Sequence, residues 1–160
     1  MPFSPALGEE IYQKPTDFLI EAFQGPPPPV QILTVVGELR EKARQILDHN
    51  PPSLRTRYWT KGERTVWILE EIGKVLPITT GIIIQGGLIE DVRILIYRES
   101  HGSEVRHRFF TNQFKDAQLT QKSSLSRAVD GISGATLSVH AIKRLATLAL
   151  LYDQEIRHIQ

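Results

Sequence analysis

The sequence contains no cysteine, and this excludes disulfides, thiolate metal sites, cysteine-ligated iron–sulfur clusters and thiol redox chemistry. No apolar run approaches the roughly 18 residues that a membrane-spanning helix needs. The opening residues, Met1 to Pro5, have neither the basic nor the apolar region of an export signal. We therefore expect a chain with no membrane span and no export signal of its own.

The sequence also has no large excess of charge of either sign. The formal net charge is +1 over 160 residues, which gives no reason to expect nucleic acid or an anionic membrane surface as a partner. The glycine-rich dinucleotide fingerprint and the phosphate loop of nucleotide hydrolases are absent. Gly131-Ile132-Ser133 begins a nucleophile elbow, but Ala135 stands where its second glycine belongs. The length predicts one domain with a sizeable core.

The first third of the chain predicts two helices. Residues 1–14 have no clear period and are predicted to be loosely ordered, with a single domain over 15–160. A helix is expected to begin near Pro15, to bury Phe18, Leu19, Ala22 and Phe23, and to stop at Gly25. Pro26 to Pro29 predict an extended connector, although such a run is also a possible docking ligand. A second helical period ends at Asn50-Pro51-Pro52 and comprises Leu39, Ala43, Ile46 and Leu47.

The following residues predict strands. One hairpin is expected to turn at Lys61-Gly62, and a clearer one, 78–85 with 88–97, at Gly86-Gly87. We expect a loop over 98–103, a further strand over 105–110 and a short helix over 112–117. The last helix is expected over 137–156 because its apolar residues form one broad face. The predicted class is α+β, with antiparallel hairpins in a twisted sheet packed against helices.

The stretch from Asp130 to Thr136 reads Asp-Gly-Ile-Ser-Gly-Ala-Thr and runs directly into that last helix. A helix start has unpaired backbone N–H groups, and the helix dipole favours negative charge there. Gly134 and Ala135 add little bulk, and Thr136 offers a hydroxyl, so we expect a phosphate-linked cofactor at this place. In the alternative interpretation, Ser133 simply caps the helix and the glycines shape the turn.

This stretch resembles the flavinylation motif, Asp-x-x-Ser-Gly-Ala-Thr, of the FMN-binding domain family. Three further blocks resemble short exported members of that family: residues 67–73, 97–102 and 109–114. Together the similarity covers roughly residues 12–152. The resemblance implies a twisted antiparallel sheet, an FMN bound through a phosphoester to Thr136, and a working place in the periplasm or another exported space.

A threonine hydroxyl is a weak nucleophile unless a base or a metal activates it. The sequence places no strong base beside Thr136; His140, one turn further along the helix, is a candidate for approaching the phosphate and is otherwise a surface residue. The resemblance implies that a separate magnesium-dependent FAD:protein FMN transferase moves FMN from FAD onto the threonine. The chain is then not an enzyme but an electron carrier, with a redox protein or a membrane redox complex as its partner.

The resemblance also implies ring contacts from the loop Glu99, Ser100, His101 and Gly102, and from Phe114. This loop departs from the Thr-Pro-Gly-Leu-Gly-like segment of relatives in large complexes. Among the tryptophans, Trp67 is expected in the core, and Trp59 is equally open to a core position or a flavin contact. Asp130 is expected to order the turn or to help the transferase recognise the site.

No metal site is expected, because His101 and His107 with their neighbouring glutamates match no ligand spacing. Two rival functions remain open. One is a non-covalent FMN-binding or sensory module, and the other is an interaction domain that has lost the flavin.

Overall fold

The fold is built on a sheet of six antiparallel strands in the order β1-β6-β5-β4-β3-β2. A computed structural model describes residues 8–159 of the chain. The strands are β1 (Glu10–Ile11), β2 (Gln31–Thr34), β3 (Arg55–Lys61), β4 (Arg64–Ile72), β5 (Pro77–Gln85) and β6 (Leu88–Tyr97). The helices are α1 (Pro15–Phe23), α2 (Gly37–Leu47), α3 (Arg108–Thr111) and α4 (Thr136–Ile159), with 3-10 turns at Ser103–Arg106 and Asn112–Phe114.

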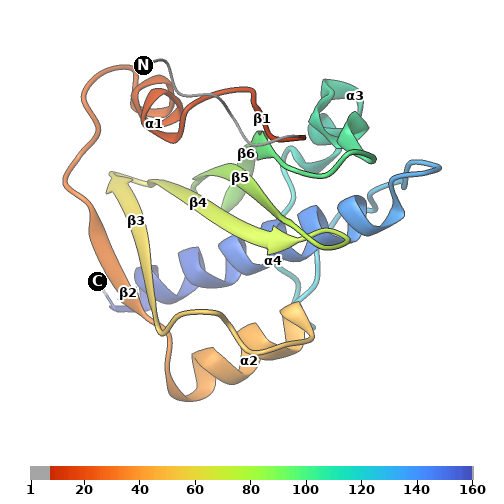
Figure 1. The fold of residues 1–160 in the computed structure, drawn as a ribbon. Helices are drawn as coiled ribbons and strands as arrows, with labels where there is room; N and C mark the ends of the chain where they lie inside the picture. Colours follow the sequence, from red (N-terminus) through yellow and green to blue (C-terminus); the bar gives the residue numbers. More distant parts are fainter. Residues whose placement is uncertain (1–7, 160) are drawn as a thin grey trace.

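Helices cover both faces of this sheet (Figure 1). The long helix α4 runs across one face and α2 packs beside it, whereas α1 lies on the other face. Side chains alternate between the two faces along a strand. Trp67 and Leu69 of β4 therefore join the main core under α4, and Val66 joins a smaller cluster with Phe18 of α1. Within the described residues, no helix is long and apolar enough to cross a membrane.

Trp67 anchors α4 on the sheet. It is fully buried, stacks on Tyr58 at 5.1 Å between ring centroids, and lies 5.7 Å from the Tyr152 ring of α4. Its indole N–H donates to the Thr65 hydroxyl at 2.9 Å, and that hydroxyl donates to Asp153 of α4 at 2.8 Å. Burial raises the pKa of the Asp153 carboxyl, which Thr65 and the nearby Arg157 only partly offset. The prediction that Trp67 is a core residue is confirmed.

The predicted α+β class is confirmed. The helix expected from Pro15 is α1, the helical period around Ala43 is α2, and both predicted hairpins form, as β3–β4 and β5–β6. Helix α4 extends beyond the predicted range at both ends. Residues 27–30 form no helix or strand, as expected for the proline connector.

The strand expected over 105–110 is wrong. Residues 103–106 form a 3-10 turn, and α3 follows at Arg108–Thr111. Four consecutive residues, 106–109, are exposed, which is incompatible with the alternation of a half-buried strand. Phe110 and Phe114 are the buried pair; their four-residue spacing is helical, and their rings meet edge to face at 5.5 Å. The helix expected over 112–117 is reduced to a 3-10 turn at Asn112–Phe114.

Two short strands were not predicted. Strand β2 follows the proline connector and pairs with β3, and β1 pairs with β6 through Glu10 and Ile11. The N–H groups of Tyr12 and Gln13 both donate to the Leu95 carbonyl. Part of the N-terminal stretch expected to be loosely ordered is thus bound to the edge of the sheet, and residues 1–7 lie outside the described residues.

We predict that Gly81→Ala destabilises the fold. A Cβ at position 81 would lie 2.4 Å from the Phe18 ring, and Phe18 is fully buried between α1 and the sheet. Overpacking of this kind costs about 1–3 kcal/mol. Chemical denaturation measures the loss, and the same substitution should cost less in a Phe18→Leu background. Gly131→Ala is the control, because nothing lies within 4 Å of its added Cβ; an equal loss there would contradict this explanation.

Candidate functional site

Helix α4 begins with a turn that leaves its first N–H groups free. The Ala135 N–H donates to the Ile132 carbonyl at 3.0 Å, and the Val139 N–H donates to the Ala135 carbonyl at 2.9 Å. Within the described chain, the N–H groups of Thr136, Leu137 and Ser138 have no protein acceptor. The first turn of α4 contains no acidic residue. The positive end of this helix is therefore open to an anion.

The residues of the turn differ in their burial. Ala135 is buried in the main core, whereas Ser133, Gly134 and Thr136 are exposed. Gly134 has a φ of +83°, which favours glycine. The alternative in which Ser133 caps the helix finds no support among the described contacts, because the Ser133 side chain forms no hydrogen bond there. Ala135 is buried against the core, so the Thr136 side chain that follows it on the helix is directed toward solvent.

The loop after β6 is fixed to the start of α4 by the Tyr97 hydroxyl. This group donates to the His101 carbonyl and is hydrogen-bonded to the Ser138 hydroxyl at 2.8 Å. Burial raises the pKa of Tyr97, so it remains a protonated donor at neutral pH. Gly102 packs against the same pair: an added Cβ would lie 2.6 Å from the Tyr97 hydroxyl and 2.7 Å from the Ser138 hydroxyl. Only glycine fits there, also because its φ is +91°.

Glu99, in the same loop, binds the turn between β4 and β5. One of its carboxylate oxygens accepts three backbone hydrogen bonds, from Lys74 at 3.1 Å, Val75 at 2.6 Å and Leu76 at 2.7 Å. Burial by itself would raise the pKa of Glu99. The three N–H donors and the charge of Lys74 outweigh that effect and hold the pKa below its ordinary value. The carboxylate thus holds the turn against the loop.

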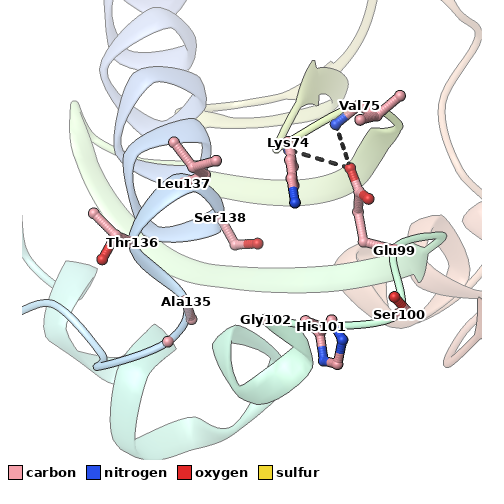
Figure 2. A pocket seen from close by; sticks show the side chains of 11 residues that line it. Lys74, Val75, Glu99, Ser100, His101, Gly102, Ala135, Thr136, Leu137 and Ser138 are labelled. Atoms are coloured by element: carbon pink, nitrogen blue, oxygen red, sulfur yellow. Dashed lines mark hydrogen bonds between the residues drawn. The ribbon is translucent and has the colours of Figure 1, made fainter.

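A cavity of about 550 Å³ lies among these three segments. Figure 2 shows side chains reaching it from the start of α4, from the loop after β6 and from the β4–β5 turn. Seven residues proposed from the sequence line it: Glu99, Ser100, His101, Gly102, Gly134, Ala135 and Thr136. Four others were missed: Lys74, Val75, Leu137 and Ser138. A cavity of this size is in the range of small-molecule and cofactor sites.

The missed residues had little signal of their own. Val75 and Leu137 are 66% and 51% exposed, and a sequence gives no reason to expect an apolar side chain in such a position. Lys74 is in a hairpin turn, where lysine is ordinary. Only the folded arrangement brings that turn to α4.

The remaining proposed residues lie outside the cavity lining. Phe114 is fully buried in the main core, and Trp59 packs against the smaller cluster on the α1 face. His140 is exposed on α4. Asp130 lies in the turn before α4, where its backbone exchanges hydrogen bonds with the Gln113 side chain. Ser133 is adjacent to the lining residue Gly134 but does not itself line the cavity.

Residues 8–159 include no cluster of three or more histidine, cysteine, aspartate or glutamate side chains that would hold a metal ion. His101 and His107 do not converge with the glutamates near them in sequence. The polar groups of the cavity are hydroxyls, free N–H groups, one imidazole, one ammonium and one carboxylate.

The fold and the cavity define a small binding domain with an anion-binding helix start beside a space of cofactor size. A comparison with protein-family models matches residues 73–151 to the FMN-binding domain family. Residues 73–151 therefore form an FMN-binding domain of that family, and the match supports FMN as the ligand. Searches of curated proteins and of solved structures found no match. The matched range runs from the β4–β5 turn to α4 and so includes every segment that lines the cavity.

We predict that Glu99→Gln lowers stability in a pH-dependent way. The folded pKa of Glu99 is depressed, so its contribution is present above the unfolded pKa, ordinarily 4.5, and is lost as the pH falls through the folded pKa. Wild type should be the more stable protein at about pH 7, and the difference should shrink in more acidic solution. Denaturant unfolding at a series of pH values measures it. Glu63→Gln, in the exposed β3–β4 turn, is the control. A difference that is independent of pH would show that the carboxylate charge is not responsible.

Proposed function

We propose that this chain is an electron carrier whose FMN is bound covalently, through a phosphoester, to the hydroxyl of Thr136. The observation that carries the proposal is the place of Thr136. It is exposed on the first turn of α4 and lines the cavity of about 550 Å³. A hydroxyl in this place is accessible to a modifying enzyme and adjacent to the space that the ring requires.

The residues of the site fit FMN. A phosphodiester keeps one negative charge, and the free N–H groups of Thr136, Leu137 and Ser138 supply donors at the positive end of α4. The other two long helices have an acidic residue in their first turn, Asp17 in α1 and Glu38 in α2, but α4 has none. Negative charge at the start of α4 is thus left to the ligand.

The cavity also suits a flat ring with one apolar and one polar edge. Val75 and Leu137 contribute exposed apolar surface, and covering such surface stabilises a complex by about 25 cal/mol per Å². His101, Ser100 and the Lys74 ammonium contribute polar groups. FMN supplies the acceptance and return of electrons, while the protein supplies placement and electrostatics.

The attachment step requires another protein. In the described structure no hydrogen bond connects the Thr136 hydroxyl with a base, and the carboxylate of the cavity lining, Glu99, is engaged with three N–H groups. We infer that a magnesium-dependent FAD:protein FMN transferase acts on Thr136. The threonine oxygen bonds to the FMN phosphorus, the pyrophosphate bond of FAD breaks, AMP leaves with the bridging oxygen, and the hydroxyl proton is released. The chain is then a substrate of that enzyme and not a catalyst.

Electron transfer implies a redox partner, either a separate protein or a membrane redox complex. The resemblance to exported, stand-alone members of the family supports a location in the periplasm or an equivalent space. The cavity is open at the molecular surface through exposed residues such as Val75 and Thr136, so a partner has access to a ring held there.

We predict that Thr136→Ala abolishes covalent loading and leaves the fold intact, because the side chain is exposed and forms no hydrogen bond among the described residues. The protein is co-expressed with the transferase and denatured, and its intact mass is measured by mass spectrometry. Wild type should gain the mass of one FMN and Thr136→Ala none. Thr16→Ala is the matched control, because Thr16 is an exposed threonine in the first turn of α1 and lies outside the motif, and it should load as wild type does.

Other outcomes distinguish the rival functions. Full loading of Thr136→Ala would move the attachment elsewhere, with Ser133 as the next candidate. An unmodified mass from a yellow native protein would indicate non-covalent FMN. A colourless native protein would favour an interaction domain that has lost the flavin.

A further inference from the structure

The cavity lining has few charged side chains, and they differ in how free they are to interact with a ligand. The lining contains one lysine and one glutamate, Lys74 and Glu99, together with the imidazole of His101. The negative charge of the Glu99 carboxylate is already stabilised by hydrogen bonds from three backbone N–H groups. Among the described residues Lys74 forms no salt bridge, whereas most of the arginines of the sheet and α4, such as Arg64 and Arg144, are paired with carboxylates. The Lys74 ammonium is therefore free to interact with a ligand.

The backbone at Lys74 is also held in place. Its N–H and those of the next two residues donate to Glu99, and the neighbouring Gly73 N–H donates to the Leu76 carbonyl at 3.2 Å. Gly73 packs closely under the turn, since an added Cβ would lie 3.1 Å from Ile78. In Figure 2 the Lys74 side chain extends from this turn into the space between Ser138 and Glu99. The backbone of the turn is therefore fixed, and its Lys74 side chain places a positive charge in the cavity.

We propose that Lys74 raises the reduction potential of the bound FMN by stabilising the negative charge of the reduced flavin. Two-electron reduction leaves the ring anionic once its N1 proton has dissociated, and a cation in the same cavity favours that form. The α4 helix dipole acts in the same direction, but its positive end is shared with the phosphate. Lys74 is the cation of the cavity lining that remains available to the ring.

This inference rests on FMN occupying the cavity, as the proposed function states, but it does not require the phosphoester. Lys74 is exposed, so water screens its charge in the free protein. A ring in the cavity displaces part of that water, and the interaction becomes stronger in the loaded protein. Removal of Lys74 would leave the Glu99 carboxylate in the lining without the lysine charge, which disfavours an anionic ring further.

The test is a spectroelectrochemical titration of the flavin-loaded protein at about pH 8, where imidazoles carry little charge. Lys74→Gln should decrease the equilibrium constant for two-electron reduction about tenfold, which corresponds to a potential about 30 mV lower. Lys74→Arg keeps the charge and should retain the wild-type potential. Lys143→Gln is the matched control: it removes the same charge from α4, but position 143 lines a different cavity.

A second readout is the pH dependence of the potential. In Lys74→Gln, the pH at which two electrons become accompanied by one proton instead of two should move upward, because the N1 proton is then held more tightly. A wild-type potential and an unchanged pH dependence in loaded Lys74→Gln would overturn the proposal, as would an equal shift in Lys143→Gln.

The failure of this inference is distinguishable from the failure of covalent attachment. Intact mass reports whether each protein carries the phosphoester before its potential is measured. If Thr136 is unmodified but native protein binds FMN, the same titration on the non-covalent complex supports or overturns the role of Lys74. A wild-type protein that holds no FMN in either form would overturn both proposals.

Discussion

The site depends on one buried hydroxyl, that of Tyr97. It lies at the end of β6 and is bonded both to the His101 carbonyl of the following loop and to the Ser138 hydroxyl of α4. These bonds join two segments that are far apart in the sequence and fix them side by side. The close packing of Gly102 on the same two hydroxyls leaves little freedom in their separation. Because a buried hydroxyl without a partner costs free energy, the loop and the helix start are held in this single arrangement.

The electrostatics of the cavity differ from those of the remaining interior. Elsewhere, buried carboxylates are paired with side chains: Glu71 accepts from His49 and Arg144 as well as from the Ile72 N–H, and Asp153 accepts from Thr65 and is paired with Arg157. At the cavity, the described hydrogen bonds to the Glu99 carboxylate come from backbone N–H groups, and the nearby charge of Lys74 lowers its pKa without forming a salt bridge. The open start of α4 and the Lys74 ammonium therefore face the same space. The free N–H donors of α4 and the Lys74 ammonium, unpaired among the described residues, suit an anionic cofactor that becomes more negative on reduction.

The sequence predicted the long elements well and the short ones poorly. The 3.6-residue period of α1, α2 and α4 and the Gly86-Gly87 turn are strong local signals, and each appears in the structure. Strands β1 and β2 are too short for a period to be read, and their strand conformation depends on pairing with β6 and β3. Residues 105–110 contain apolar side chains that resemble a strand locally, but the packing of Phe110 against Phe114 selects helical turns.

The sequence by itself determined the helix start at Thr136, its small and permissive approach, and the resemblance to an FMN-binding domain, because these depend on consecutive residues. The tertiary structure alone decided that the β4–β5 turn, with Lys74 and Val75, lines the same cavity as that helix start, and that Trp59 and Phe114 lie outside the lining. Backbone conformation and capping are local properties that neighbouring residues dictate. The β4–β5 turn, the loop after β6 and the start of α4 are instead brought together by the burial of Tyr97 and Trp67 and by the hydrogen bonds of the Glu99 carboxylate. These contacts form only when the sheet and α4 pack together.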